Sequence, residues 1–364
     1  MRKIIGCLVF TALAPVSQIA LAQVQVVTSF SIIGDIAAQI GGDAVEVTDI
    51  VGPDQDAHVY SPSVADARAL VTADLIVLNG LGFETWAEAL VAGSGTSASI
   101  VTVTDALPLV LHNEEEEDHD EHGDHEDAEH HDEHEVHGHD DHEDHKDHDD
   151  HGHEDHGHEE HKDEGGHDDH EDHGKETMDA HAHHDHGEFD PHAWGAMVNA
   201  IVYAQVIRDA LIAVDPDQAT IYAANFNAFE AEGLLLRDGF AARIAALPAD
   251  HRTVVTSHDA FGYLAEETGL RFLAPKGFNS ASVANAGEVR ELIETLRALP
   301  HAAVFVESLH NSALVDQIAA EANLVVSDQV LYSDALSGLG GPAGTYLDYY
   351  RHNLESILTA LEAN

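Results

Sequence analysis

The sequence has almost no cysteine. The only one, Cys7, lies within the first 22 residues, so the chain beyond them has no means of forming a disulfide or a thiolate metal site. Basic residues are also scarce, because 15 lysines and arginines stand against 68 aspartates and glutamates, for a formal net charge of −53. This excess of negative charge argues against nucleic-acid binding and suits a protein that binds cations.

Long apolar runs are confined to the N-terminus. Two basic residues, Arg2 and Lys3, precede an apolar stretch that Pro15 interrupts, and an A-x-A motif at residues 20–22 follows it. This pattern predicts a cleaved secretory signal peptide over residues 1–22 and not a membrane-spanning helix. No later stretch is continuously apolar over the roughly 18 residues of a membrane span, so we expect an exported, soluble protein.

Residues 112–187 differ in composition from the rest of the chain. They hold 24 of the 31 histidines and 34 of the 68 acidic residues, with three lysines and no aromatic residue. Such a segment has too little apolar surface to offset the entropy of ordering it, so it is predicted to be disordered. Interleaved imidazoles and carboxylates are typical of metal-binding tracts, whereas a purely acidic solubilising tail needs no histidines. We expect several weak metal sites in this insertion.

Strand and helix patterns alternate on both sides of the insertion. Buried strands are predicted before it at residues 24–28, 45–51, 75–78 and 100–103, and after it at residues 254–257, 302–306 and 325–326. Helical patterns follow most of these strands. This alternation predicts an α/β fold with mostly parallel sheets and helices on both faces.

One helical pattern is unusually long. It runs from Asp215 to about Ala246 and would extend roughly 45 Å, too far for a crossover on one small sheet. The chain after it repeats the chain before it, because VVTS at residues 254–257 matches VVTS at 26–29 with an offset of 228. We therefore interpret the long helix as a connector between two pseudo-symmetric α/β lobes.

The predicted organisation has four parts. A signal peptide covers residues 1–22, and an N-terminal lobe covers residues 23–214 with the insertion inside it. The connecting helix covers residues 215–247, and a C-terminal lobe covers residues 248–364. Open α/β sheets bind ligands beyond the carboxyl ends of their strands, so the site is expected in the cleft between the lobes.

Four residues are candidates for that site. His58 and His258 each follow a predicted strand, His192 begins a helix, and Asp334 lies in a loop after a strand of the second lobe. Three imidazoles and a carboxylate suit tetrahedral zinc, whereas manganese generally prefers more oxygen ligands. Each histidine alone is more often structural, but their shared position at strand and helix ends makes them candidate ligands. Either Asp334 or water completes the coordination.

The remaining polar candidates have less specific interpretations. Asp190 and Asp259, next to two of the histidines, either orient the imidazole rings or cap helices. Glu84 and Glu307 would be the general bases of a zinc hydrolase, but the sequence has no H-E-x-x-H motif and a site with four protein ligands has no open position. We therefore expect no enzyme. The other histidines are expected at the surface or at helix caps (His251, His301, His310 and His352).

Several motifs in order carry a resemblance to a known family. They are GPDQDAHVYSP at residues 52–62, NGLGFE at 79–84, DPHAW at 190–194, TSHDAFGY at 256–263 and LYSDALS at 331–337. The sequence resembles the zinc/manganese solute-binding proteins of ABC importers, the ZnuA-type cluster, over essentially the whole chain after residue 22. The resemblance implies two lobes joined by one long helix, with one tight Zn²⁺ site at their interface. It also implies a periplasmic, monomeric receptor that delivers zinc to an inner-membrane ABC permease.

The resemblance also bears on the ligands and the metal. The family's ligand positions fall on His58, His192, His258 and Asp334. Manganese-type relatives usually have glutamate where this chain has His258, which favours zinc, and a histidine-rich insertion before the second ligand is likewise typical of zinc members. Some zinc members have glutamate where this chain has Ala57, which leaves Asp334 as the fourth ligand. The chain resembles most the branch served by a separate periplasmic zinc chaperone. A manganese or other divalent-metal receptor, an adhesin and a periplasmic metal store are the alternatives.

Overall fold

The computed structural model describes residues 23–108 and 189–363. These residues belong to one packed unit of the chain. The predicted signal peptide and the histidine-rich insertion, residues 112–187, lie outside the described residues.

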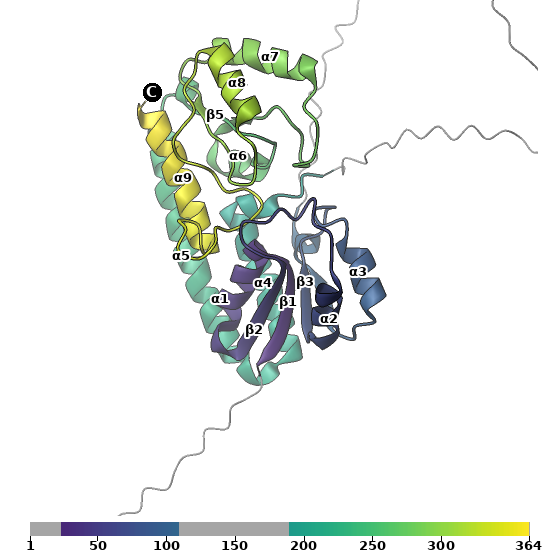
Figure 1. Ribbon diagram of the computed structural model, residues 1–364. Helices are drawn as coiled ribbons and strands as arrows, with labels where there is room; N and C mark the ends of the chain where they lie inside the picture. Colours follow the sequence, from purple (N-terminus) through teal and green to yellow (C-terminus); the bar gives the residue numbers. More distant parts are fainter. Residues whose placement is uncertain (1–22, 109–188, 364) are drawn as a thin grey trace, which may run out of the picture. The chain divides into compact units, whose positions relative to one another are not determined.

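The first half of the chain forms a four-stranded parallel sheet (Figure 1). Its strands are β1 (Val24–Phe30), β2 (Val45–Val51), β3 (Leu75–Leu78) and β4 (Ser99–Thr102), in the order β2-β1-β3-β4. The strands are short runs rich in valine, isoleucine and leucine, as expected where helices cover both faces of a parallel sheet. All four strands predicted for this region are present, within two residues of the expected bounds.

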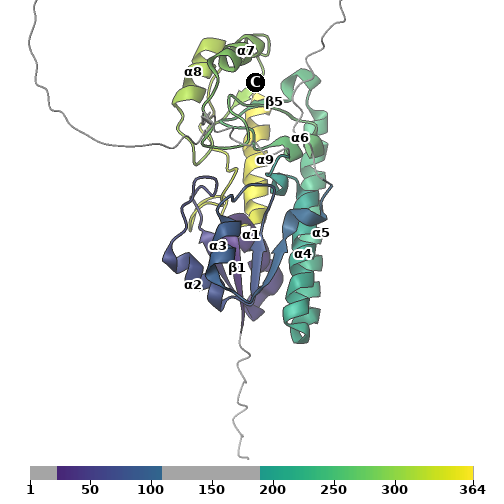
Figure 2. The same ribbon diagram turned by 90° about the vertical axis from the view of Figure 1, so that its right-hand side faces the viewer.

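Helices cover both faces of this sheet. Helix α1 (Ser31–Gly41) lies with α4 (Met197–Val214) on one face, and α2 (Val64–Thr72) lies with α3 (Ala87–Ser94) on the other (Figures 1 and 2). Helix α2 begins at a reciprocal capping box, in which the Ser63 hydroxyl accepts backbone N–H groups of the first turn and the Asp66 carboxylate accepts the Ser63 N–H. Helices α1, α2 and α3 each connect two parallel strands, so the chain crosses back over the sheet and enters every strand at the same end.

Helix α4 has the length and composition of a membrane span, and it is the one described helix that does. It nevertheless carries Arg208 and Asp209, and its buried residues include Tyr203, Ile207 and Leu211. These buried residues belong to the larger of the two hydrophobic cores, the main core, where α4 packs against α1 and α5 (Ala219–Ala246). The apolar composition of α4 is therefore that of a helix packed in the protein core.

Helix α5 (Ala219–Ala246) is the long helix that the sequence predicts, although a 3-10 turn (Pro216–Gln218) precedes it. Its 28 residues extend about 42 Å. Its buried residues recur at spacings of three, four or seven, which places them on one face (Tyr222, Phe226, Phe229, Gly233, Phe240 and Ile244). That face contacts α1 and α4 of the first lobe and also α9 (Tyr346–Ala363), so α5 is packed along its whole length.

The second sheet has three parallel strands, β5 (Thr253–Val255), β6 (Arg271–Leu273) and β7 (Ala303–Val304), in the order β6-β5-β7. Its helices are α6 (Gly262–Thr268), α7 (Ala286–Arg297) and α8 (Ala313–Ala322). The strand predicted at residues 325–326 is wrong as an element: Val326 forms only an isolated bridge to Val304. The side chain of Val325 is 87% exposed, so this residue does not contribute to the core.

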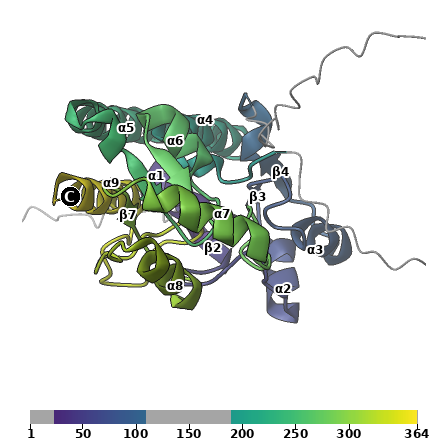
Figure 3. The ribbon, with the colours of Figure 1, turned by 90° about the horizontal axis from the view of Figure 1, so that it is seen from above.

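Side chains alternate across the second sheet. Val255 and Val304 pack with α7 and α8 in a small separate core, whereas Val254, Ala303 and Phe305 belong to the main core. Figure 3 shows α7 and α8 next to each other over this sheet, with α5 and α9 beyond it. The central strand β5 is therefore buried on both faces, as β1 is in the first sheet.

The internal repeat corresponds to a repeated topology. In each lobe the central strand, β1 or β5, is followed by a helix and an edge strand on one side, while β3 or β7 lies on its other side. The aligned glycines have the same role. A Cβ atom on Gly34 would lie 1.8 Å from Oδ1 of Asp49, and one on Gly262 would lie 2.6 Å from Oδ2 of Asp190. At each glycine, the missing side chain lets a carboxylate approach the helix backbone.

Candidate metal centre

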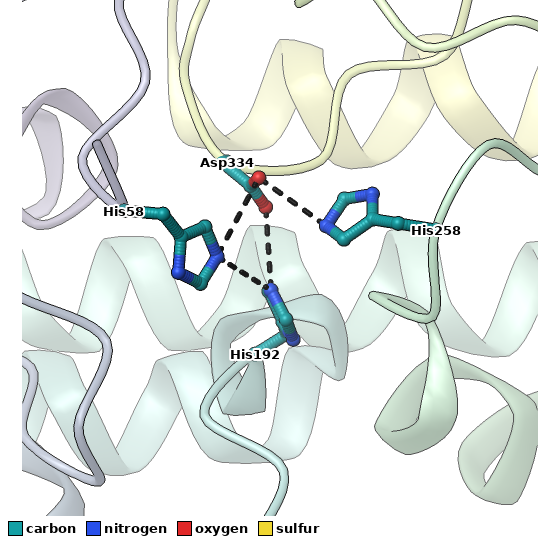
Figure 4. Close-up of side chains that lie close together, drawn as sticks. All are labelled: His58, His192, His258 and Asp334. Atoms are coloured by element: carbon teal, nitrogen blue, oxygen red, sulfur yellow. Dashed lines mark hydrogen bonds and ion pairs between the residues drawn. The ribbon is translucent and has the colours of Figure 1, made fainter. Parts of the chain in front are cut away.

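Four loops bring the four candidate ligands together (Figure 4). His58 lies in the turn after β2, and His258 follows β5. His192 precedes the 3-10 turn Ala193–Gly195 that leads into α4, and Asp334 lies in the loop before α9. The cluster therefore combines two residues that precede the long helix α5, His58 and His192, with two that follow it, His258 and Asp334.

The donor atoms of the cluster are close to one another. Nε2 of His58 lies 3.3 Å from Nε2 of His192, and Oδ2 of Asp334 lies 3.3 Å from Nε2 of His258. The carboxylate of Asp334 also lies 3.5 Å from Nε2 of His192 and 3.8 Å from Nε2 of His58. All four residues offer a donor atom within 4.8 Å of every other.

These separations match the coordination shell of a small divalent cation. Ligands at the Zn–N distance of a tetrahedral site are separated from one another by about 3.3–3.4 Å. Three nitrogens and a carboxylate at 3.3–3.8 Å from their neighbours can therefore surround one ion with small movements of the side chains.

The cluster is shielded from solvent. The side chains of His192, His258 and Asp334 are 0% exposed, and that of His58 is 4% exposed. The ring of Phe83 packs against His58 at a centroid distance of 4.6 Å, and Trp194 packs against His192 at 5.2 Å. This apolar surrounding strengthens electrostatic attraction between the ligands and a bound cation.

His192 is held by its neighbour in the DPHAW motif. Oδ1 of Asp190 lies 2.8 Å from Nδ1 of His192 and accepts the His192 backbone N–H at 2.9 Å. The hydroxyl of Tyr263 donates to the carbonyl of Asp190, and the amide of Asn79 donates to the carbonyl of Pro191. Of the two interpretations of Asp190, the structure supports the orientation of the ring, since Nδ1 is engaged and Nε2 faces the cluster.

His258 is held by a residue distant in sequence. Oε2 of Glu307 lies 2.7 Å from Nδ1 of His258, while Oε1 accepts the backbone N–H groups of Ser257 and His258. Sequence reasoning considered Asp259 for this place and Glu307 only as a general base. The strand-end argument that selected His258 would also have selected Glu307, because that residue follows the predicted strand at residues 302–306.

Asp334 is positioned through the carbonyl of the preceding residue. That carbonyl, of Ser333, accepts the indole N–H of Trp194 at 2.9 Å and the hydroxyl of Tyr349 at 3.3 Å. The backbone N–H of Leu336 donates to the Ser31 hydroxyl at the start of α1. The Asp334 loop is therefore tied both to the His192 loop and to the first lobe.

The expectation that His310 is a surface or capping residue is wrong. Its side chain is 6% exposed, and its ring stacks on that of His258 at a centroid distance of 4.6 Å. Its neighbour Glu307, 3.8 Å away, completes a second group of potential metal ligands with His258. Sequence analysis missed His310 because it lies beyond a strand end in an irregular loop.

The remaining histidines lie outside the cluster. His251 and His301 stack on each other at a centroid distance of 3.8 Å, near Asp250, at the amino ends of β5 and β7. His352 lies on α9 and approaches the carbonyl of Val330. The amino ends of the strands are the opposite edge of the sheet from His258, so His251 and His301 lie away from the cluster, and His352 is not among the side chains that offer it a donor atom.

Charge in the cluster is strongly perturbed. Burial lowers the pKa of His58 to about 4, although Asp334 acts in the opposite direction. Burial also disfavours charge on His258, but Glu307 and Asp334 outweigh it and raise the pKa of His258 well above its usual value. Burial would raise the pKa of Asp334, yet His258, His192 and His58 hold it well below its usual range. The direction of the pKa shift of His258 favours a proton on this ring, beside Glu307 and Asp334, when no metal is bound.

Glu84 lies outside the cluster and has a structural environment. Its carboxylate accepts the Ser29 hydroxyl at 2.9 Å and the Asn79 backbone N–H at 2.6 Å. Burial raises the pKa of Glu84 against these hydrogen bonds. It therefore holds the NGLGFE turn and is not positioned as a general base at the cluster.

The fold and the cluster define a two-lobed, metal-binding receptor of the solute-binding class. The model of the family "Zinc-uptake complex component A periplasmic" matches residues 26–360, and the chain belongs to this family. The family is one of transport components, which confirms the prediction that the chain is not an enzyme.

Similar proteins differ in the metal that their names give. "Manganese-binding lipoprotein MntA" of Halalkalibacterium halodurans is 27% identical over 340 residues, 93% of this chain and 88% of its own. "Zinc-binding protein TroA" of Treponema pallidum is 25% identical over 341 residues, 92% of this chain and 88% of its own. A solved periplasmic metal-binding protein of Candidatus Liberibacter asiaticus is 28% identical, with a TM-score of 0.68, and the match covers 93% of this chain and 100% of that one.

Proposed function

We propose that this protein captures zinc with high affinity and delivers it to an ABC permease for import. The observation that carries the proposal is the group of three imidazole nitrogens and one carboxylate, contributed by His58, His192, His258 and Asp334, with neighbouring donors 3.3–3.8 Å apart. This donor set suits tetrahedral zinc. All four side chains are buried, as expected for a site that must exclude water from its ligands.

Zinc is proposed over manganese because of the donor chemistry. Nitrogen-rich sites suit zinc, whereas manganese prefers carboxylate, carbonyl and water oxygens. Manganese remains the second candidate, since relatives of comparable identity are named for manganese and for zinc. Competition between the two metals, followed by the fluorescence of Trp194 beside His192, tests the choice. Preference for manganese at equal free concentrations would overturn the zinc assignment.

The proposed setting is the periplasm. Residues 1–22 would act as a cleaved signal peptide, and the receptor would work as a monomer with lobes at residues 23–214 and 248–364 on either side of the connecting helix. The family description names a periplasmic uptake complex, which supports a membrane permease as the partner. A separate zinc chaperone is a further proposed partner, and N-terminal sequencing of the exported protein tests the cleavage site.

The insertion is proposed to collect metal through weak sites. The competing function is a metal store, in which residues 112–187 bind zinc and the cluster does not. Zinc titration of the full chain, compared with a variant carrying a short Gly/Ser linker in place of residues 112–187, separates the two. The variant is expected to keep one tight site and lose the weak ones. Loss of tight binding with the insertion would overturn the receptor proposal.

A further inference from the structure

His310 is a buried side chain with unsatisfied polar atoms. Its side chain is 6% exposed, and neither Nδ1 nor Nε2 has a hydrogen-bond partner among the described residues. Burial of such a ring is unfavourable unless a ligand or water satisfies its nitrogens. The unpaired nitrogens of His310 therefore indicate that this ring binds a ligand through a nitrogen lone pair.

A carboxylate lies beside this ring. Oε2 of Glu307 is 3.8 Å from Nδ1 of His310 and 2.7 Å from Nδ1 of His258. The two imidazole rings stack with an interplanar angle of 27°. His258, Glu307 and His310 each offer a donor atom within 4.8 Å of the others, and two imidazoles with a carboxylate are a common ligand set for zinc.

One imidazole belongs to both groups of ligands. Nδ1 of His258 faces Glu307, while Nε2 of the same ring lies 3.3 Å from Oδ2 of Asp334 in the four-residue cluster. The four-residue cluster is buried, so an arriving ion must exchange its hydration shell for protein ligands on the way in. The two groups use different nitrogens of this ring: while Nδ1 holds the ion beside Glu307, Nε2 carries the ring proton, and when the ion passes to Nε2 the proton returns to Nδ1 and donates to Oε2 of Glu307. The hydration shell is thereby exchanged in two steps.

We propose that His310, Glu307 and His258 form a transfer site, which holds a divalent cation before it passes to His58, His192 and Asp334. The inference rests on the proposed function, because it assumes that the four-residue cluster is the tight site. His310 is the component specific to the transfer site, since Glu307 also holds the His258 ring.

Kinetics distinguish a transfer site from a merely structural role. An intermediate on the binding path affects neither the free nor the fully bound state, so its loss slows association and dissociation by the same factor and leaves Kd unchanged. A residue that only positions His258 stabilises the bound state, so its loss weakens Kd and acts mainly on dissociation.

The test uses the full chain, zinc alone and stopped-flow tryptophan fluorescence. His310→Phe keeps an aromatic ring stacked on His258 but removes both nitrogens. The insertion contains no aromatic residue, and both tryptophans lie near the cluster: Trp194 is 5.2 Å from His192, and Trp86 donates to the carbonyl of Ala57, next to His58. The signal therefore reports on the cluster. Association and chelator-driven dissociation are both expected to slow by about tenfold, within the range over which association rates vary between related variants. His352→Phe, a histidine change outside both groups, is the control.

Three outcomes decide the matter. Equal slowing of both rates with Kd within about twofold of the parent supports the transfer site. Unchanged rates, or a weaker Kd with unchanged association, overturn it. If His310→Phe does not fold, His310→Gln removes the imidazole with less change in volume, and the same two rates decide. Absence of a tight site in the unmodified chain would instead count against the proposed function.

Discussion

One oxygen of the Asp190 carboxylate, Oδ1, contacts His192 twice: it lies 2.8 Å from Nδ1 of the ring and accepts the backbone N–H at 2.9 Å. The first contact places the Nδ1 proton on the side of the carboxylate, so the lone pair of Nε2 faces the cluster. The other oxygen, Oδ2, would be 2.6 Å from a Cβ atom on Gly262. The absence of a side chain at residue 262 is therefore part of what positions His192.

Gly262→Ala is expected to lower zinc affinity by about tenfold, the lower part of the range for losing a hydrogen-bond partner of a metal ligand. The new methyl group must displace the Asp190 carboxylate and with it the His192 ring. Gly34→Ala is the matched control, because its Cβ would meet Asp49 in the other lobe. It should lower stability and leave affinity unchanged. Calorimetric titration and thermal unfolding of both variants measure the difference; equal affinities in the two would contradict this account.

His192→Ala is expected to remove high-affinity zinc binding while the fold remains intact. It deletes one of the four donors, which should cost more than the roughly 10–100-fold typical of losing an outer hydrogen-bond partner. Zinc titration followed by fluorescence measures the loss, and far-ultraviolet circular dichroism checks the fold. His301→Ala, a histidine change at the opposite sheet edge, is the control. Parent-like affinity in His192→Ala would rule out the ligand assignment.

Glu307→Gln should weaken zinc binding by about 10–100-fold. The amide retains an acceptor for the backbone N–H groups of Ser257 and His258 but loses the charge beside Nδ1 of His258. Glu84→Gln is the matched control, since it neutralises another buried glutamate outside the cluster. The zinc affinity of Glu84→Gln should stay within about twofold of the parent, because this change removes no hydrogen-bond partner of a metal-binding side chain. A similar loss in both variants would show that Glu307 acts through general stability.

Zinc affinity should depend on pH throughout the neutral range. The pKa of His258 is raised well above its usual value, so at neutral pH zinc must displace a proton from this ring. Affinity is therefore expected to fall about tenfold for each pH unit below the raised pKa of His258, with release of about one proton per zinc at pH 7. His58, with its pKa lowered to about 4, adds to this only in strong acid.

Calorimetry of the tight site in buffers of different ionisation enthalpy measures this proton release. The same proton on His258 also affects the stability of the metal-free protein. Because the folded state raises the pKa of His258, the proton stabilises the metal-free fold below the usual histidine pKa of about 6.5 and is lost as pH rises through the raised value. Affinity that stays flat between pH 8 and 6 would contradict the placement of His258 between two carboxylates.

Much of the fold follows from local patterns in the sequence. Short apolar runs, alternating with helical periodicity, predict parallel strands and the long helix, because these patterns depend on neighbouring residues. The VVTS repeat predicts the matching central strands β1 and β5. The weakest predictions concern residues 325–326 and the small second sheet, whose strands are only two or three residues long and depend on pairing with distant segments.

The sequence by itself determined the family and the four side chains that gather in the cluster, since each lies in a short motif at the end of an element. The tertiary structure alone decided which groups surround them. Glu307 reaches His258 because β7 pairs with β5, and the ring of His310 stacks on His258 because an irregular loop returns over the sheet edge. Strand pairing and loop packing join residues about 50 positions apart, so a local pattern can place Glu307 at the end of a strand but cannot place it beside His258.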